Sequence, residues 1–374
     1  METRTFLSEL DPGKLESILD EVVRGFNNSK QTVFDILPFA TEFKFRALEL
    51  NALLTTFNDL IPVGSRKRDL LTQSAIINWI HCTNKIEFAG FNSYNDTKKA
   101  ITSQMPGDTK PEKETIDTLE LLKETYKPIG TPFAQLGIDI VKIQKWHKIL
   151  FFRADPAISG KFRKDGRQVQ NQDGSTHIFP HHSIILNSLN NLFKITHHLW
   201  KMIFEVVMDP EEKLLYTFSL AAFVQFHFVD IHPFEDGNGR MCRFLSKIII
   251  DTMCPLPFPM FPIRLDYLAT LEQARKVDAI LAPEQLCSLL FQVAINFYKK
   301  MIKEHTNQPF DSCFGADDEV DVRKYLETLN ASQDEIESII HQFNQLEQDQ
   351  KIIVQVQNEQ ILLKKLLSVF IEDI

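Results

Sequence analysis

Hydrophobic residues recur at intervals of three and four along most of the chain. Residues 211–229 show the pattern most densely, with Leu214, Leu215, Phe218 and Ala222 on one stripe, which predicts a buried helix. The same spacing predicts further helices over residues 12–24, 43–58, 67–83, 112–125, 183–204, 240–252, 264–280 and 283–303. We therefore expect an all-α core.

Two segments depart from helical spacing. Residues 160–180 contain two Asp-Gly pairs around short extended pieces, which predicts a β-hairpin or flap. Residues 351–363 alternate between polar and apolar side chains and predict a second hairpin, which follows two predicted helices, residues 319–329 and 332–347. This order of elements predicts a small winged-helix-like α+β module over residues 316–374.

Charge and composition narrow the class of protein. The 374-residue chain has a formal net charge of −9, and residues 316–374 hold −8 of it, with 13 acids against 5 bases. No nucleic-acid partner is therefore expected. Five cysteines without a Cys-x-x-Cys pair indicate reduced thiols. The charged N-terminal segment lacks an apolar signal sequence, and the most apolar stretch, residues 244–263, contains charges and four prolines. We expect no membrane span and an intracellular, cytoplasmic location.

The placement of glycine marks one position in the chain. There are 13 glycines in all, but residues 175–314 contain only Gly237 and Gly239. These two lie just before the predicted helix 240–252, where free N–H groups and the positive end of the helix dipole suit a phosphate. Glycine lets the backbone approach an anion closely, and Asn238 adds a side-chain amide donor. The sequence therefore predicts an anion-binding site.

The side chains around these glycines add reactive chemistry. Arg240 and Arg243 lie three residues apart on the first helical turn, where two guanidiniums can clamp terminal phosphates. Asp236 offers an oxygen ligand for Mg²⁺, and His232 suits proton abstraction from a hydroxyl. Each residue alone fits an ordinary corner between two helices. The combination indicates transfer of a phosphate-containing group from a nucleotide to a nucleophile.

The segment IHPFEDGNGRMCR, residues 231–243, resembles the signature of Fic-domain proteins (Fido superfamily), His-x-Phe-x-Asp/Glu-Gly-Asn-Gly-Arg-x-x-Arg, and matches every specified position. The resemblance implies a helical core with a β-hairpin flap. It also implies adenylylation (AMPylation), the transfer of AMP from ATP to a Ser, Thr or Tyr hydroxyl of a target protein. By the resemblance, His232 is the base and Asp236 is the ligand of Mg²⁺ or Mn²⁺. The anion hole is formed by Gly237, Asn238 and Gly239, and the phosphates are clamped by Arg240 and Arg243.

The resemblance extends over roughly residues 83–303. Gly160, Phe162 and Arg163 look like one end of the family's flap, and His177 and Phe179 look like the other. In the family, this flap aligns the target backbone by strand addition.

Resemblance is weaker around the base of the nucleotide. Tyr267 stands in the region that flanks the family's adenine pocket, but Leu268 and Arg275 stand where familiar members have a Tyr and an Asn. Other donors used in the family, UTP and CDP-choline, therefore stay open.

Residues 83–87, TNKIE, resemble the family's inhibitory motif, Ser/Thr-x-x-x-Glu-Gly/Asn. In the family this Glu, here Glu87, pairs with the second motif arginine, here Arg243, and displaces the γ-phosphate. The motif starts at Thr83 and precedes the core, as in the class with an N-terminal inhibitory helix, here about residues 67–88. Phe88 occupies the Gly/Asn position.

Three regions are expected. Residues 1–125 form an N-terminal helical region that includes the inhibitory helix, residues 126–305 form the catalytic core, and residues 316–374 form the acidic module. The leading hypothesis is an autoinhibited protein adenylyltransferase whose partners are ATP and a target protein, with a homodimer as an option. One alternative keeps the fold but removes AMP, with Glu87 positioning water. Another is a non-enzymatic regulator that only binds nucleotide.

Overall fold

The computed structural model describes residues 44–103, 107–125, 137–171, 174–205, 207, 209–261, 264–276 and 284–307. The chain divides into two compact units, Met1–Phe314 and Gly315–Ile374. The whole second unit lies outside the described residues, as does the predicted helix 12–24. The winged-helix-like module therefore stays a prediction.

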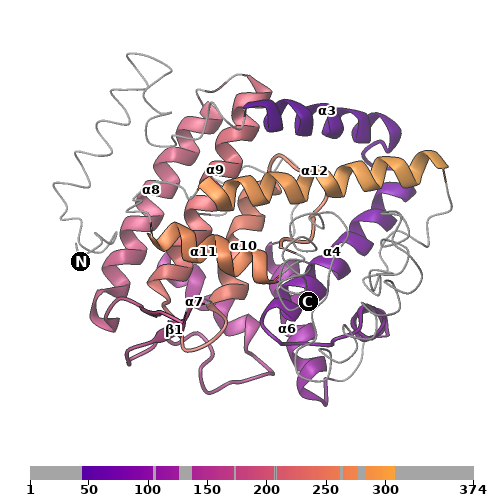
Figure 1. Cartoon of the computed structure of the whole chain (residues 1–374). Coiled ribbons are helices and arrows are strands. Elements are labelled where there is room, and N and C mark those ends of the chain that lie inside the picture. The colour runs from indigo at the N-terminus through magenta and orange to yellow at the C-terminus, as the bar shows by residue number, and fades with distance from the viewer. Residues whose placement is uncertain are drawn as a thin grey trace, which may run out of the picture. The chain divides into compact units, whose positions relative to one another are not determined.

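Helices make up most of the described chain (Figure 1), so the all-α class is confirmed. In chain order they are α3 (Lys44–Leu60), α4 (Arg66–Ile86), α5 (Tyr94–Thr102), α6 (Lys110–Thr125), α7 (Ile140–Leu150), α8 (Ile185–Glu205), α9 (Pro210–Ile231), α10 (Asn238–Ile250), α11 (Arg264–Lys276) and α12 (Glu284–Asn307). A short 3₁₀ helix, η3 (His182–Ile184), precedes α8.

The sequence analysis does not predict α5 or α7. Asp139 caps α7 by accepting a hydrogen bond from the Lys142 N–H at 2.7 Å. The buried residues Ile143, Trp146 and Leu150 follow at helical spacing. At 9 and 11 residues, both helices have apolar stripes too short to stand out by periodicity alone.

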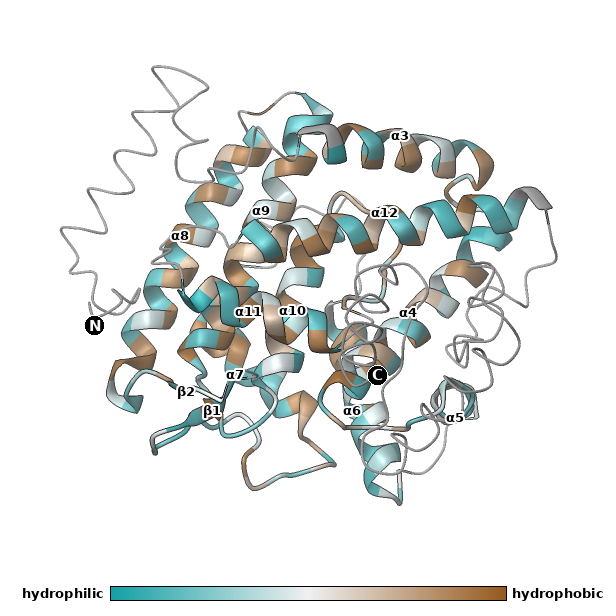
Figure 2. Cartoon of the chain, viewed as in Figure 1, coloured by the Kyte–Doolittle hydropathy of each residue, from teal (hydrophilic) through white to brown (hydrophobic). Residues whose placement is uncertain are grey.

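Helix α9 runs through the core of the described fold. Pro210 takes its first position, where a missing N–H is tolerated, and residues 214–231 are all buried. Helices α3, α8, α10 and α12 contact it, and Figure 2 shows apolar residues on these central helices. By length and composition α9 could span a membrane, but its most apolar window is entirely buried inside the fold. A helix that is apolar on all sides is typical of such a core.

The predicted flap contains a two-stranded antiparallel hairpin, β1 (Gln168–Gln170) and β2 (Thr176–Ile178). At its base, Phe162 forms an isolated antiparallel bridge with Phe234, and their ring centroids lie 5.2 Å apart. The flap is thereby attached to the loop between α9 and α10.

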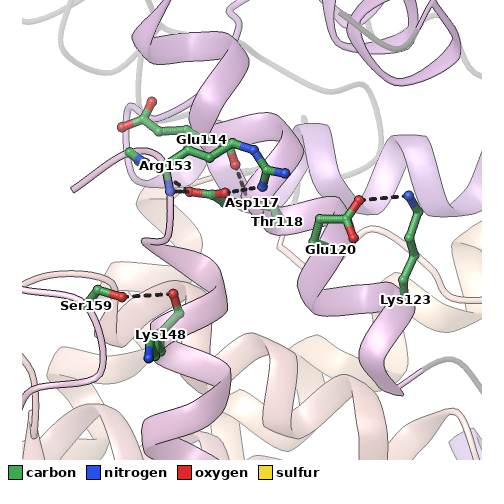
Figure 3. A network of polar contacts seen from close by, with 9 residues as sticks. Glu114, Asp117, Thr118, Glu120, Lys123, Lys148, Arg153 and Ser159 are labelled. Atoms are coloured by element: carbon green, nitrogen blue, oxygen red, sulfur yellow. Dashed lines mark hydrogen bonds and ion pairs between the residues drawn. The ribbon is translucent and has the colours of Figure 1, made fainter. Parts of the chain in front are cut away.

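A buried carboxylate joins α6 to the turn after α7. Asp117 accepts hydrogen bonds from the backbone N–H groups of Arg153 and Ala154 at 2.7 and 3.0 Å, and from Arg153 Nη1 at 2.9 Å (Figure 3). These bonds satisfy the carboxylate, whose side chain is fully buried.

Replacing Asp117 with Asn should lower the free energy of unfolding by on the order of 3 kcal/mol, because the new amide N–H groups face buried donors. Urea unfolding measures the loss. The matched control is Glu120→Gln, since Glu120 pairs with Lys123 at the surface, and its effect should stay within about 0.5 kcal/mol. Equal losses in the two variants would contradict this account.

Candidate active site

The end of α9 and the start of α10 meet at the predicted motif. His232 caps the C-terminus of α9 with φ 51° and ψ 58°, in the left-handed region that favours glycine. Its N–H donates to the Phe228 carbonyl at 3.1 Å. Because this backbone conformation costs a non-glycine residue roughly 1 kcal/mol, other contacts must stabilise it.

The side chain of Arg163 supplies such contacts. Its buried guanidinium donates to the His232 carbonyl at 2.5 Å and to the Ile231 carbonyl at 3.3 Å. These carbonyls belong to the helix end that lacks internal partners, where a cation is also favourable. The same guanidinium donates to the carbonyls of Asp165 and Pro180 in the flap. Arg163, which the resemblance assigns to one end of the flap, is buried between the flap and the motif.

The imidazole of His232 is held in a form that can accept a proton. Nδ1 lies 3.2 Å from the Val229 carbonyl, and a carbonyl only accepts, so Nδ1 carries the hydrogen and Nε2 keeps its lone pair. Burial lowers the pKa of His232 to about 4, and the charges of Arg163 and Arg275 act in the same direction. Near pH 7 the ring is therefore neutral, as a general base requires.

Asn238 holds the loop that follows His232. Its Nδ2 donates to the Phe234 carbonyl and its Oδ1 accepts from the Phe234 N–H, both at 2.9 Å. One of the two Nδ2 hydrogens is thus used within the loop, and the predicted contact of this amide with a phosphate stays a prediction. The backbone N–H groups at the start of α10 remain as donors.

His147 on α7, which the sequence analysis missed, ties this loop to the flap. Its Nδ1 accepts from the Gly160 N–H and its Nε2 donates to the Asp236 carbonyl, both at 3.0 Å. The ring stacks on Phe234 at 3.7 Å, and burial lowers the pKa of His147 to about 4. The only sequence signal for this role is its place beside Trp146 on the buried face of α7.

An anion site lies at the N-terminus of α10. Arg240 and Arg243 are both buried. Arg240 Nε and Nη1, and Arg243 Nη1, have no hydrogen-bond partner among the described residues. Buried N–H groups on a guanidinium are costly unless an anion binds them. Together with the helix dipole they suit a phosphate.

The carboxylate of Glu87 lies inside this anion site. Its Oε1 is 2.7 Å from Arg243 Nη2, and a Cβ at Gly239 would lie 1.9 Å from the same oxygen. Burial raises the pKa of Glu87, but the charge of Arg243, with those of Arg240 and Arg264, outweighs burial and holds the pKa below its usual value. The ionised carboxylate thus pairs with a guanidinium that a phosphate would also use.

The last turn of α4 contributes a second partner for the same arginine. Arg243 Nε donates to Thr83 Oγ1 and Nη2 donates to the Thr83 carbonyl, both at 2.9 Å. Thr83 and Glu87 are four residues apart, so one helical turn presents both to Arg243.

The backbone after Glu87 explains the Gly/Asn preference of the inhibitory motif. Phe88 has φ 54°, in the region that Gly and Asn tolerate best. Its side chain is 83% exposed, and the Arg264 guanidinium lies 4.7 Å from its ring centroid. Arg264 Nε also donates to the Ile86 carbonyl at 2.8 Å. Arg264, which the sequence analysis missed, therefore stabilises this strained turn from outside.

Helix α6 anchors the turn from the other side. Glu114 Oε2 accepts from the Gly90 N–H at 2.7 Å, and Thr118 Oγ1 donates to Asn84 Oδ1 at 3.1 Å. Figure 3 shows Glu114 and Thr118 on α6 beside Asp117. One helix thus holds both the turn that carries Glu87 and the turn after α7.

Asp236 is the candidate metal ligand. It is exposed at the edge of the anion site, and its Oδ1 accepts from the Gly237 N–H at 2.6 Å. No group of three or more His, Cys, Asp or Glu within the described ranges could hold a metal ion. A single carboxylate still fits Mg²⁺, which is commonly bound by one or two carboxylates and completed by substrate phosphates.

Comparison with known proteins identifies this arrangement. Residues 137–250, which contain α7 to α10 and the flap, match the sequence profile of the Fic/DOC family. This segment of the chain is similar to a Fic domain. It is 27% identical over 223 residues to the protein adenylyltransferase Fic of Nematostella vectensis, a match that covers 58% of this chain and 48% of that protein. A Fido domain-containing protein of Dictyostelium discoideum is 38% identical over 58 residues, or 15% of this chain and 41% of that protein. The chain thus spans about half the length, or less, of these relatives.

Solved structures share the fold of the Fic domain. A Fic domain containing signaling protein from Bacteroides thetaiotaomicron has a TM-score of 0.54 at 16% identity, covering 70% of this chain and 98% of its own. Fic-1 from C. elegans has a TM-score of 0.53 at 18% identity, covering 80% of each chain. At these identities the likeness concerns the fold alone.

Two further predicted residues, Phe179 and Tyr267, have buried side chains. Phe179 is buried and stacks on the His232 ring at 3.9 Å. Tyr267 is also buried, stacked on Phe261 at 4.5 Å and with the Arg243 guanidinium 5.6 Å from its ring centroid. The ring of Tyr267 therefore has almost no exposed surface in this structure, and its place beside an adenine pocket stays a prediction.

The Gly239→Ala substitution should destabilise the wild-type chain by on the order of 1–2 kcal/mol, because its methyl group displaces Glu87 from Arg243. In a Glu87→Ala background the same substitution should be neutral or slightly stabilising, since alanine favours a helix. Thermal unfolding of the four variants measures this coupling. Gly166→Ala is the control, because a Cβ there meets no atom within 4 Å. Equal effects of Gly239→Ala in both backgrounds would show that Glu87 does not occupy this space.

Proposed function

We propose that the chain is a protein adenylyltransferase that transfers AMP from ATP to a Ser, Thr or Tyr hydroxyl of a target protein. One observation carries the proposal. A neutral imidazole whose Nε2 keeps its lone pair lies in one short segment with an anion site, whose buried guanidinium N–H groups have no hydrogen-bond partner in the part of the chain that the structure describes. A protein that only binds nucleotide needs the second feature but not the first.

The reaction follows from these groups. His232 Nε2 takes the proton of the target hydroxyl, whose oxygen then forms a bond to the α-phosphorus of ATP. The bond from that phosphorus to the oxygen bridging the β-phosphate breaks, and pyrophosphate leaves. Arg240 and Arg243 stabilise the charge that develops on the leaving phosphates, so most of the catalysis is positioning and electrostatic.

Asp236 is the residue that would hold Mg²⁺ or Mn²⁺. When bound, the ion would neutralise phosphate charge and align the leaving group. Gly237 orients this carboxylate through its N–H, and His147 fixes the backbone of Asp236 from behind.

Glu87 would keep the enzyme inactive in its resting state. Its carboxylate and the terminal phosphate of ATP compete for the same charge on Arg243. A nucleotide whose phosphates cannot reach Arg243 lies out of line for attack on its α-phosphorus. The inhibitory element is α4, which precedes the matched Fic segment.

The flap would present the target hydroxyl to His232. The side chains of β1 are exposed, as are Thr176 and Ile178 on β2, so a target segment could pair with the hairpin by strand addition. Target recognition would then depend mainly on the backbone, with the acidic module as a further contact.

Incubation with labelled ATP and Mg²⁺ tests the proposal. Glu87→Gly should increase the label on the chain or on proteins of a cell extract by at least tenfold over wild type, because Arg243 becomes free for phosphate. Adding His232→Ala should abolish the label, because the base is lost. Label that survives His232→Ala would exclude this mechanism.

Two further arms separate the open alternatives. If label appears only with UTP or CDP-choline, the chain transfers a phosphate-containing group as proposed, but ATP is not its donor. If the wild type instead removes AMP from a premodified target and Glu87→Gly does not, then Glu87 activates water. Nucleotide binding without transfer in every variant would favour a regulator.

A further inference from the structure

A second polar cluster lies beside the catalytic histidine, and the motif does not include it. Asp230, two residues before His232, has a side chain only 5% exposed. Its Oδ1 lies 3.2 Å from Arg275 Nε on α11 and 3.1 Å from His177 Nε2 on β2. One buried carboxylate oxygen on α9 thus contacts both α11 and the flap.

The same two partners also contact the ring that covers His232. The His177 ring meets Phe179 edge to face, with centroids 4.9 Å apart and an interplanar angle of 86°. The Arg275 guanidinium lies 5.5 Å from the Phe179 centroid. Phe179 stacks on His232 at 3.9 Å and 20°. A continuous chain of contacts therefore runs from Asp230 to the imidazole.

The cost of burying an unpaired charge holds this cluster together around the carboxylate of Asp230. A buried carboxylate is stable only when it is paired, and the hydrogen bond from Arg275 Nε pairs Asp230. His177 Nε2 lies 3.1 Å from the same oxygen, so both side chains are gathered at one place. Phe179 then contacts both of these polar side chains as well as the imidazole. The inner end of the flap cannot shift without breaking one of these contacts.

We propose that Asp230 is a positioning residue for AMP transfer, which holds Phe179 against the His232 imidazole through Arg275 and His177. The flap end and the base then keep one relative geometry when a target hydroxyl arrives. This inference rests on the proposed role of His232 as the base. Arg275, which departs from the Asn of familiar relatives, acquires a role in this cluster.

The electrostatics agree with this role. Phe179 covers the imidazole by stacking on it, and the charges that face His232 are those of Arg163, Arg275 and Glu87. Losing the aromatic cover should hydrate the ring and raise the pKa of His232. The acid limb of a rate profile would then move to higher pH, because the base is protonated earlier.

A double-mutant cycle in the Glu87→Gly background tests the proposal. Asp230→Asn and Phe179→Leu should each lower kcat by about tenfold, the cost of a misplaced base, with KM for ATP changed less than twofold. The double variant should be no slower than the slower single variant, because both changes break the same chain of contacts. Asp59→Asn, an exposed Asp on α3, is the matched control and should leave kcat unchanged.

A second variant protects the test against loss of folding. His177→Leu removes the polar contact to Asp230 from the flap side, outside the helical core, and should lower kcat in the same direction. Additive losses in the cycle, or an unchanged kcat in His177→Leu, would overturn the proposal.

Histidine ¹⁵N NMR gives a readout that needs no transfer reaction. The His232 signals are assigned by their absence in His232→Gln. Asp230→Asn should shift them and Phe179→Leu should raise the pKa of His232 by about one unit, whereas Asp59→Asn should do neither. Unchanged His232 signals in Asp230→Asn would refute the positioning role. Shifted signals without any AMP transfer would instead refute the proposed function.

Discussion

The charge of Arg243 has no access to water, and this constraint organises the site. A buried guanidinium needs an anion. In this structure the carboxylate of Glu87, at the C-cap of α4, pairs with Arg243, and Thr83 of α4 accepts two further hydrogen bonds from it. Gly239 has no side chain where the carboxylate lies. The left-handed turn at Phe88, the contacts of Arg264 and the bonds from α6 all keep Glu87 in place. A phosphate would satisfy the same charge, so the resting contact and the proposed activity compete for one guanidinium.

The two helix ends that meet at the site need opposite charges. The C-terminus of α9 presents carbonyls, and Arg163 binds two of them while His232 takes its left-handed conformation. The N-terminus of α10 presents N–H groups, and an anion is favourable there. Because the helices are joined by a loop of six residues, 232–237, the base and the anion site are kept close together. His147 and Asn238 then fix the path of that loop.

The sequence predicts the parts of this arrangement that depend on neighbouring residues. Apolar periodicity predicts the long helices, and the spacing from His232 to Arg243 predicts where the base and the anion site lie. Contacts between distant residues were not predictable in this way. His147 and Asp236 are 89 positions apart, and Arg264 and Ile86 are 178 apart. Asn238 is a further example of a contact that the sequence does not predict. Its residue type allows a contact with phosphate, and only the fold shows that its amide hydrogen-bonds to the backbone of Phe234.

Competition for Arg243 is most directly measured by calorimetric titration with ATP and Mg²⁺. Both chains should carry His232→Ala to prevent turnover, one with Glu87 and one with Glu87→Gly. The account predicts that removing the carboxylate tightens ATP binding by at least about tenfold. AMP, which lacks the terminal phosphates, should bind both chains within about twofold. Equal ATP affinity with and without Glu87 would contradict the account.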